Sequence, residues 1–285
     1  MLIRNHKLAP YTTWNIGGPA AFFFQPDSLE LLQKFLCEYK DQEIFWLGAG
    51  SNILVSDKGF DGVIIYPKNI LQECFVSGKY IEVGASVSIS TFLHVALKYG
   101  LTGCEFMVGI PGTIGGALFM NAGAHGGQIW DRVSLVRTID KNGSIHERNC
   151  DDFVVSYRRV INKMSQEWFL SAKLRLDKGD SKIAIQSMRE FMQHRIKNHP
   201  CLLPSCGSVF RNPKPLSAAQ LIESAGLKGL QIGGAQVSPK HANFIVNLGN
   251  ATANDVLRII DHIKKEVYAK FSVELETEVK FIGDK

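Results

Sequence analysis

The sequence predicts an α+β protein made of three small parts. Its 285 residues exceed the length of a typical single domain, and a hydrophobic fraction of 45% is enough to build packed cores. Segments with helical periodicity alternate along the whole chain with short apolar or alternating segments. Changes in this pattern divide the chain into residues 1–67, 68–180 and 181–285.

The first part has the pattern of a small α/β unit. A turn cluster at Asn15–Pro19 precedes an apolar strand at Ala20–Phe24. Asp27 is expected to begin a helix, with Glu30 three residues later in a capping-box pattern. The apolar residues of this helix recur at helical spacing: Leu29, Leu32, Phe35, Leu36 and Tyr39. Three short strands are predicted after it, at residues 44–47, 53–55 and 63–65.

The second part combines strands with one clear helix. A strand at Tyr80–Val83 leads to a helix at Ser88–Tyr99, which ends at Gly100. The turn at Lys141–Gly143 joins two strands of a hairpin, the first of which covers Val133–Ile139. A further strand is predicted at residues 168–176, because apolar and polar side chains alternate there.

In the third part, helices and strands again alternate. Helices are predicted at residues 181–197, 217–225 and 252–270, and a strand at 243–247. The proline-rich connection at residues 199–215 is too rigid to be a flexible linker. Alternation of apolar and polar side chains predicts a final strand at Val273–Phe281.

Charge, cysteine content and hydropathy exclude several classes of protein. The net charge is only +5 and basic residues are interleaved with acidic ones, so we expect no nucleic-acid partner. Six cysteines without a C-x-x-C pair fit reduced thiols, and neither they nor the eight histidines have metal-ligand spacing. No apolar run reaches the roughly 20 residues of a membrane span, and no apolar signal segment begins the chain. We therefore expect a cytoplasmic protein without a metal or a membrane partner.

Glycine gathers in two stretches that need a physical explanation. Gly48–Asn52 follows a predicted strand, where its backbone N–H groups could cradle an anion or form a tight turn. It is no dinucleotide fingerprint, because Ile53 stands where the third glycine would be. The second stretch is Gly109–Ala117, followed by Asn121–Ala124. Glycine weakens both helices and strands, so we expect this run to lie in the interior of neither kind of element. We expect either a ligand or a packed crossing of two elements to lie against it.

Three further segments carry polar side chains suited to chemistry. Ser208 follows Gly207, but the G-x-S-x-G pattern of serine hydrolases is missing. The arginines of Tyr157–Arg159 are by default surface residues. One face of the last predicted strand carries three carboxylates, among which the residues alone do not choose: Glu274, Glu276 and Glu278.

Together, these motifs resemble the UDP-N-acetylenolpyruvoylglucosamine reductase family, also called UDP-N-acetylmuramate dehydrogenase. They occur in the family's order from about residue 13 to the C-terminus, and the set is specific although no single member is. The matching segments are Gly48–Asn52, Gly109–Gly116, Asn121–Gly123, Tyr157–Arg158, Gly207–Pro213, Leu227–Gly229, Lys240–Ala242 and Leu275–Val279.

This resemblance implies a two-part FAD-binding domain of the vanillyl-alcohol-oxidase type, formed by residues 1–67 and 68–180, and a substrate-binding domain at 181–285. It also implies a cytoplasmic, monomeric enzyme of peptidoglycan precursor synthesis. Such an enzyme uses NADPH to reduce bound FAD, and then reduces UDP-N-acetylglucosamine enolpyruvate to UDP-N-acetylmuramate. Flavin N5 delivers hydride to the terminal enol-ether carbon, and the enolate-like charge beside the carboxylate must be stabilised and protonated.

The resemblance assigns roles to the matched residues. Arg158 pairs with the substrate carboxylate, Glu278 polarises or hydrogen-bonds the intermediate, and Ser208 donates the proton. The residues implied in substrate binding are Tyr157, Arg211 and Asn212. The residues implied in FAD binding are Gly48, Ala49, Gly50, Ser51, Asn52, Pro111, Gly112, Thr113, Gly115, Gly116, Asn121, Ala122 and Gly123.

The chain also departs from the family pattern. Arg159 stands where relatives often have a small or acidic residue, and Arg211 where many have lysine, which keeps the charge but changes the reach. The short segment between Arg158 and Ser208 leaves no room for the loop whose tyrosine closes over the substrate in longer members, so the chain resembles a short form. Two other interpretations stay open: another FAD-dependent oxidase of the same fold, and a nucleotide-sugar binding module without catalysis.

Overall fold

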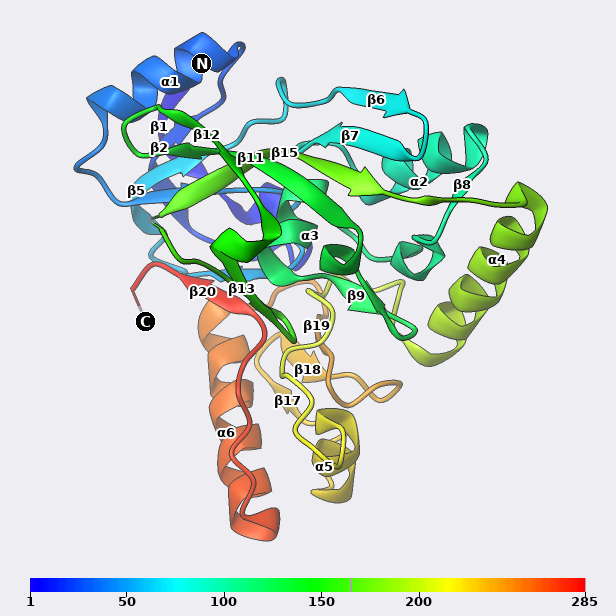
Figure 1. Cartoon of the computed structure of the whole chain (residues 1–285). Helices are drawn as coiled ribbons and strands as arrows, with labels where there is room; N and C mark the ends of the chain where they lie inside the picture. Colours follow the sequence, from blue (N-terminus) through cyan, green and yellow to red (C-terminus); the bar gives the residue numbers. More distant parts are fainter. Residues whose placement is uncertain (165, 285) are drawn as a thin grey trace. The chain divides into compact units, whose positions relative to one another are not determined.

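A computed structural model describes residues 1–164 and 166–284 (Figure 1). Helices and strands mix along the chain, which confirms the predicted α+β class. The chain divides into two compact units: unit 1 holds residues 1–2, 24–48 and 64–194, and unit 2 holds residues 3–23, 49–63 and 195–285. The expected division into residues 1–67, 68–180 and 181–285 also assigns a function to each part. It stays a prediction.

Unit 1 is built on a five-stranded antiparallel sheet with the order β12-β11-β15-β7-β6. Along β7 and β15, Ile81 and Ala172 belong to the buried face, whereas the exposed Glu82 and Lys173 are neighbours on the other face. The turn predicted at Lys141–Gly143 joins β11 to β12, as expected. The strands of this sheet are β6 (Cys74–Ser77), β7 (Tyr80–Gly84), β11 (Val133–Asp140), β12 (Ile145–Arg148) and β15 (Glu167–Arg175).

Helices α2 (Ile89–Lys98) and α3 (Ile114–Met120) share one apolar core with the buried face of the sheet. The prediction for α2 is confirmed: Ser88 caps its first turn, and Gly100 beyond its end has a φ of +66°. In Figure 1, α2 and α3 are seen behind the strands of the sheet.

Helix α1 (Leu29–Glu38) begins one residue later than expected. Its N-cap is Ser28, whose hydroxyl accepts the Leu31 N–H at 3.2 Å. The expectation that Asp27 caps this helix is wrong, because the Asp27 carboxylate accepts a 2.8 Å hydrogen bond from Asn69 instead.

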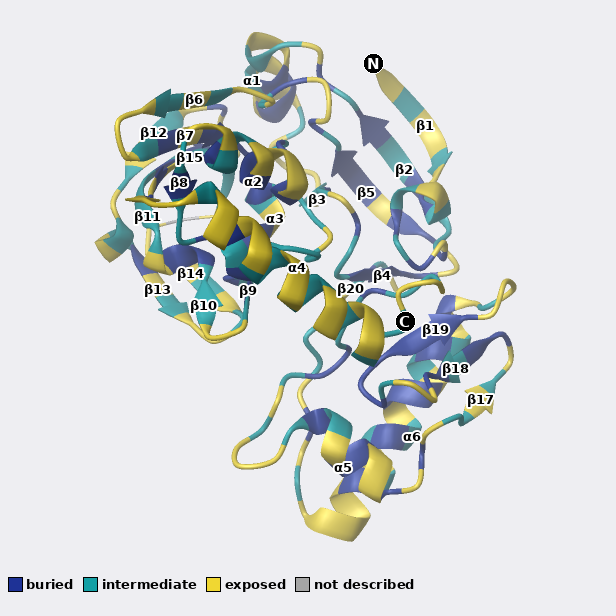
Figure 2. Ribbon diagram, turned by 90° about the vertical axis from the view of Figure 1, so that its right-hand side faces the viewer, coloured by how far each residue is buried: buried dark blue, intermediate teal, exposed yellow. Residues whose placement is uncertain are grey.

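Shorter elements complete unit 1. Helix α4 (Ser181–Asn198) follows the last of them, and its final four residues belong to unit 2. Most of α4 is exposed or half-buried, and Ala184 is its buried residue (Figure 2). The remaining strands are β3 (Ile44–Trp46), β8 (Leu101–Thr102), β9 (Gly123–Ala124), β10 (Gly127–Gln128), β13 (Phe153–Ser156), β14 (Arg159–Asn162) and β16 (Asp177–Lys178).

Unit 2 is organised around helix α6 (Ala253–Phe271). One face of this helix, including Val256, Ile259 and Ile263, is buried in the core of the unit. Trp14 from the N-terminal segment lies fully buried in the same core, where its Nε1 donates to the Ile245 carbonyl at 2.7 Å. The N-terminal residues therefore fold with the C-terminal ones.

The other elements of unit 2 are short. β17, β18 and β19 form an antiparallel sheet, β4 pairs with β20 in parallel, and β1, β2 and β5 are successive neighbours in a further sheet. Their bounds are β1 (Leu2–Lys7), β2 (Pro19–Phe24), β4 (Ile53–Val55), β5 (Phe60–Ile65), α5 (Ala218–Ser224), β17 (Gln231–Ile232), β18 (Ala235–Val237), β19 (Ile245–Asn247) and β20 (Lys280–Ile282).

The expected strand at Val273–Phe281 is wrong over most of its length. The alternation is real, since Leu275 and Val279 are buried while Glu276 is exposed. The backbone, however, pairs with residues 209–211 only around Thr277, and a ladder forms at β20 alone. Burial of alternate side chains therefore does not require a full strand here.

Candidate active site

Helix α3 (Ile114–Met120) begins inside the glycine-rich stretch Gly109–Ala117, which was expected in the interior of neither a helix nor a strand. The last four residues of the stretch form the first turn of this helix. Thr113 is the N-cap, and its Oγ1 accepts the Gly116 N–H at 3.3 Å. The first turn of α3 contains both Gly115 and Gly116, which makes it unusually free of side chains.

Gly115 allows α3 to lie directly against the segment that follows β7. Its N–H donates to the carbonyl of Ala85 at 2.8 Å, and the Ile114 N–H donates to Val87 at 2.9 Å. A Cβ at Gly115 would lie 3.0 Å from the Cβ of Ala85, closer than ordinary contact. Close packing of two elements therefore explains this glycine.

Close packing does not explain why residue 116 is a glycine. It is exposed, and a Cβ there would meet only the hydroxyl of Thr113, at an ordinary 3.6 Å. Alanine would be more favourable than glycine in a helix by about 1 kcal/mol. An exposed helical glycine of this kind leaves room for a ligand to approach the backbone.

The two glycine-rich stretches meet at Gly48. A Cβ at this residue would lie 3.0 Å from Thr113 Oγ1, and both residues belong to unit 1. The rest of the first stretch belongs to unit 2, where Gly50 has a φ of +64° and a Cβ would clash with the carbonyl of Tyr11. There, Asn52 donates from Nδ2 to the Glu278 carbonyl at 3.2 Å, linking a predicted cofactor residue to a predicted catalytic one.

At the other end of α3, Asn121 is the C-cap and has a left-handed backbone with a φ of +44°. Its side chain is buried, with 1% of the residue exposed, and hydrogen-bonds within the protein. The predicted cofactor residues Asn121–Gly123 lie against the predicted Tyr157–Arg158 turn between β13 and β14. Arg158 donates to the carbonyls of Asn121 at 3.2 Å and of Gly123 at 2.6 Å.

In unit 2, Ser208 begins a segment that is held on two sides. On one side, the buried Asn243 accepts the Phe210 N–H at 2.9 Å and donates to the Phe210 carbonyl at 2.8 Å. On the other side, the Glu278 N–H donates to the Val209 carbonyl at 2.8 Å. Ser208 is half-buried, and the structure thus brings it close to Glu278 along the backbone. Asn243 was missed by sequence reasoning, because its role depends on a contact with a distant segment.

The three carboxylates near the C-terminus have different surroundings. Glu274 and Glu276 are exposed, and Glu276 pairs with Arg211 at 3.0 Å. Glu278 is half-buried. Burial raises the pKa of the Cys206 thiol well above its usual range, and the nearby negative charge of Glu278 raises it further. Of the three carboxylates, Glu278 is therefore the least exposed, and its backbone lies beside the Ser208 segment.

The predicted substrate residues Arg211 and Asn212 lie in the same unit. Arg211 is tied to the C-terminal segment through its N–H, which donates to the Glu276 carbonyl at 2.9 Å. Asn212 accepts the Ala218 N–H at 3.1 Å at the start of α5. Arg158 and Tyr157 belong to unit 1.

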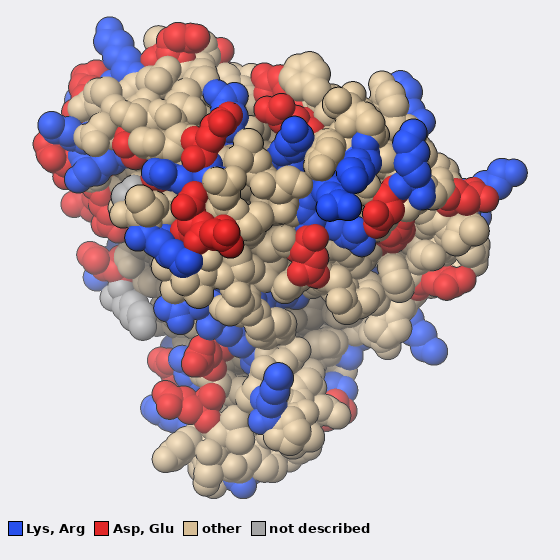
Figure 3. Space-filling model, in the orientation of Figure 1, with Lys and Arg blue, Asp and Glu red and all other residues tan. Residues whose placement is uncertain are grey.

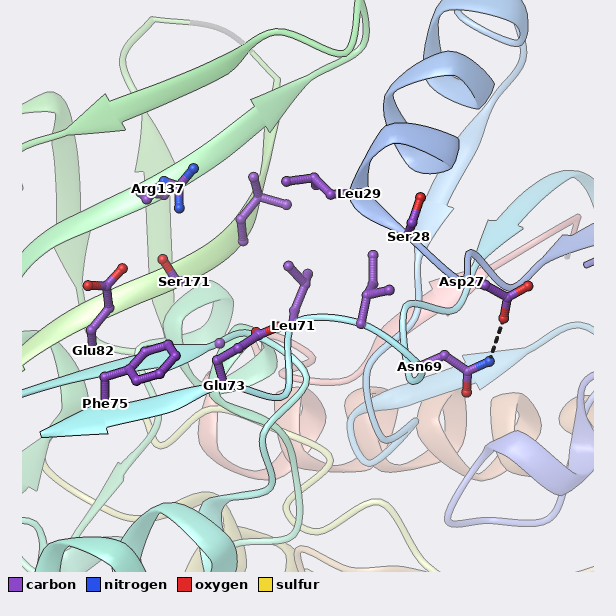
Figure 4. Close-up of a pocket in the computed structure, with 13 residues that line it drawn as sticks. Asp27, Ser28, Leu29, Asn69, Leu71, Glu73, Phe75, Glu82, Arg137 and Ser171 are labelled. Carbon is purple, nitrogen blue, oxygen red and sulfur yellow. Dashed lines mark hydrogen bonds between the residues drawn. The ribbon is translucent and has the colours of Figure 1, made fainter.

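A cavity of about 420 Å³ lies elsewhere in unit 1, and none of the predicted site residues lines it (Figure 4). Arg137 and Glu82 from the exposed face of the sheet border it, together with Phe75, Asn69 and Asp27. It carries more acidic than basic side chains, which is unsuited to a pyrophosphate.

Over residues 1–164 and 166–284, no His, Cys, Asp or Glu cluster of three or more could hold a metal ion. No helix in this part of the chain combines the length and apolar character that crossing a membrane would need. Figure 3 shows acidic and basic side chains interspersed over the face in view.

Two family models and several curated relatives match the chain. A family model described as the C-terminal domain of UDP-N-acetylenolpyruvoylglucosamine reductase matches residues 199–282, and a model of an FAD binding domain matches residues 20–149. The UDP-N-acetylenolpyruvoylglucosamine reductase of Legionella pneumophila (strain Corby) is 46% identical over 99% of this chain and 92% of its own length. The enzyme of that name from Alkalilimnicola ehrlichii is 43% identical over 97% and 93%.

A solved structure has the same fold. The UDP-N-acetylenolpyruvylglucosamine reductase (MurB) from Thermus caldophilus superposes with a TM-score of 0.85 at 31% sequence identity, covering 99% of this chain and 98% of that one. The similarity thus spans nearly the whole chain. The chain belongs to the UDP-N-acetylenolpyruvoylglucosamine reductase family.

Proposed function

We propose that this protein is an FAD-dependent oxidoreductase that uses NADPH to reduce UDP-N-acetylglucosamine enolpyruvate to UDP-N-acetylmuramate, a step of peptidoglycan precursor synthesis. The observation that carries the proposal is the 46% identity to a relative of that name over 99% of the chain. We further propose that the enzyme acts as a cytoplasmic monomer. Its FAD-binding parts are residues 1–67 and 68–180, and residues 181–285 bind the substrate.

The residues of the glycine-rich segments fit an FAD molecule. The exposed backbone at Gly116 and its neighbour Thr113, beside Gly48, would meet the pyrophosphate. Gly48–Asn52 and residues 111–116 would contribute main-chain groups, and residues 121–123 would face the isoalloxazine with their main chain. When bound, FAD would transfer a hydride from NADPH to the terminal carbon of the enolpyruvyl double bond.

Arg158 would bind the substrate carboxylate. Its two terminal nitrogens are already oriented by the carbonyls of Asn121 and Gly123. Negative charge grows beside this carboxylate when hydride is added to the double bond. A guanidinium fixed before the reaction stabilises that charge without reorganising.

Ser208 would then donate a proton to the carbon next to the carboxylate. A serine hydroxyl is a weak acid, so it needs a neighbour that supports the transfer. Glu278 is the half-buried carboxylate whose backbone adjoins the Ser208 segment, and it would hydrogen-bond the intermediate. Tyr157, Arg211 and Asn212 would hold the nucleotide sugar.

Replacing Gly116 with alanine tests the cofactor-binding segment. We expect Gly116→Ala to leave the flavin-free protein as stable as the wild type or up to about 1 kcal/mol more stable, because alanine favours the helix. We expect the Kd for FAD to rise about tenfold or more, because the added methyl group occupies ligand space. Unfolding curves and FAD titrations measure the two effects.

The contrasting variant is Gly115→Ala, which should destabilise the protein by about 1–3 kcal/mol, because Ala85 lies against that position. Wild-type affinity for FAD in Gly116→Ala would show that the cofactor does not approach this helix.

The proposed reaction is tested by following its two halves separately in the wild type and in Ser208→Ala. The wild type should bind FAD, be reduced by NADPH, and be reoxidised by the enolpyruvyl nucleotide sugar. Without its proton donor, Ser208→Ala should reoxidise about 10²–10⁴-fold more slowly with the sugar, while reduction by NADPH stays at the wild-type rate. Rapid-mixing absorbance measurements give both rates.

An equal loss in both halves would refute the role of Ser208. A wild-type protein that binds no FAD, or that is reoxidised by oxygen but not by the sugar, would refute the proposed function.

The choice of carboxylate is tested with a matched pair of variants. We expect Glu278→Gln to lower the rate of reoxidation by the sugar about 10²-fold, as removal of one stabilising group at a reacting centre does. Glu274→Gln makes the same chemical change at an exposed position of the same segment, and should leave the rate within about twofold of the wild type. Similar rates for the two variants would exclude Glu278 from the site.

A further inference from the structure

We propose that Asn121 is a positioning residue, which holds the turn of the β13–β14 hairpin so that Arg158 points into the site. That Arg158 then meets the substrate carboxylate rests on the proposed function. The hydrogen bonds of Asn121 are a property of the protein itself.

The side chain of Asn121 is fully engaged within unit 1. Its Nδ2 donates one hydrogen to Gln128 Oε1 at 2.8 Å and the other to the Ser156 carbonyl at 3.1 Å, while Oδ1 faces the Trp130 N–H at 3.4 Å. Gln128 in turn donates to Asp131, so its oxygen must face Asn121. The amide thus has one consistent orientation, and no N–H is left for a flavin.

The turn that Asn121 holds has an unfavourable backbone. Ser156 and Arg159 are paired across the hairpin, and Arg158 between them has a φ of +54°, which is uncommon for a residue with a long side chain. Such a conformation costs about 1–3 kcal/mol and persists only where surrounding contacts impose it. Asn121 supplies two of those contacts: its side chain binds the Ser156 carbonyl, and its own carbonyl accepts from Arg158.

The opposite end of the hairpin is fixed independently. The Glu167 carboxylate is completely buried and accepts hydrogen bonds from Asn162 at 2.9 Å, from Thr138 at 2.6 Å and from both ends of the Arg148 guanidinium. Loss of the Asn121 contacts should therefore loosen the turn without unfolding the hairpin.

The residue type at position 121 fits this role. Asparagine tolerates the left-handed backbone that ends α3, and it is one of few side chains that can donate two hydrogens to carbonyls there. Glycine would keep the backbone but lose the side-chain bonds, and aspartate would keep the shape but lose both donors. These two substitutions separate the hydrogen bonds from the helix end.

The first arm of the test measures the turn directly by amide hydrogen exchange in the FAD-loaded protein. Asn121→Gly and Asn121→Asp should each speed exchange at residues 156–159 by about tenfold, the effect of one to two lost hydrogen bonds. The control Asn5→Gly makes the same change at another left-handed asparagine, exposed and in unit 2, and should leave those residues unchanged. Unchanged exchange in both Asn121 variants would overturn the proposal.

The second arm asks whether Asn121 acts through Arg158, by measuring reoxidation by the enolpyruvyl nucleotide sugar. We expect Asn121→Gly to slow it about 10–100-fold, because small displacements of a positioned group are costly. In an Arg158→Ala background, the same change should have less than about a twofold further effect. Additive losses, or loss of FAD with unchanged exchange at the turn, would overturn the proposal. Failure of the wild type to react with the sugar would refute the proposed function instead, and the exchange arm would still decide the role of Asn121.

Discussion

The close contact between helix α3 and the segment after β7 is the constraint on which the unit 1 site depends. The N–H groups of Ile114 and Gly115 donate to the carbonyls of Val87 and Ala85, and a side chain at Gly115 would press against Ala85. This contact fixes where the helix begins. It also fixes which of its residues remain exposed.

Both ends of α3 then acquire a role. At the start, Thr113 lies beside Gly48. The neighbouring Gly116 is exposed, and the packing of the helix does not require a glycine there. At the end, Asn121 and Gly123 orient Arg158. In unit 2, a second set of contacts brings the Ser208 segment beside the half-buried Glu278. Each unit thus prepares a polar arrangement by hydrogen bonds of its own backbone.

Local sequence patterns predicted those elements whose signals are local. The α2 cap at Ser88 and the hairpin turn at Lys141–Gly143 depend on neighbouring residues, so they could be read from the chain. The sequence alone does not distinguish Gly115 from Gly116. Close packing explains only Gly115, because a side chain there would meet Ala85. Glu276 and Glu278 likewise differ through contacts with residues more than sixty positions away.

The roles of the site residues came from the resemblance to a family rather than from spacing or periodicity. The structure adds why particular side chains stand where they do, and for Asn121 it indicates a different task from the one that the resemblance implies. Positioning residues of this kind are hard to find in a single sequence, because several of their partners are backbone groups that any residue supplies.

The most direct measurement is amide hydrogen exchange of the flavin-free protein compared with the FAD-loaded protein. We expect FAD to protect residues 111–116 and 121–123 together with the loop at Gly48, since bound backbone exchanges more slowly. Protection confined to the walls of the separate cavity, around Asp27, Asn69 and Arg137, with none in residues 111–123, would contradict the placement of the cofactor at α3.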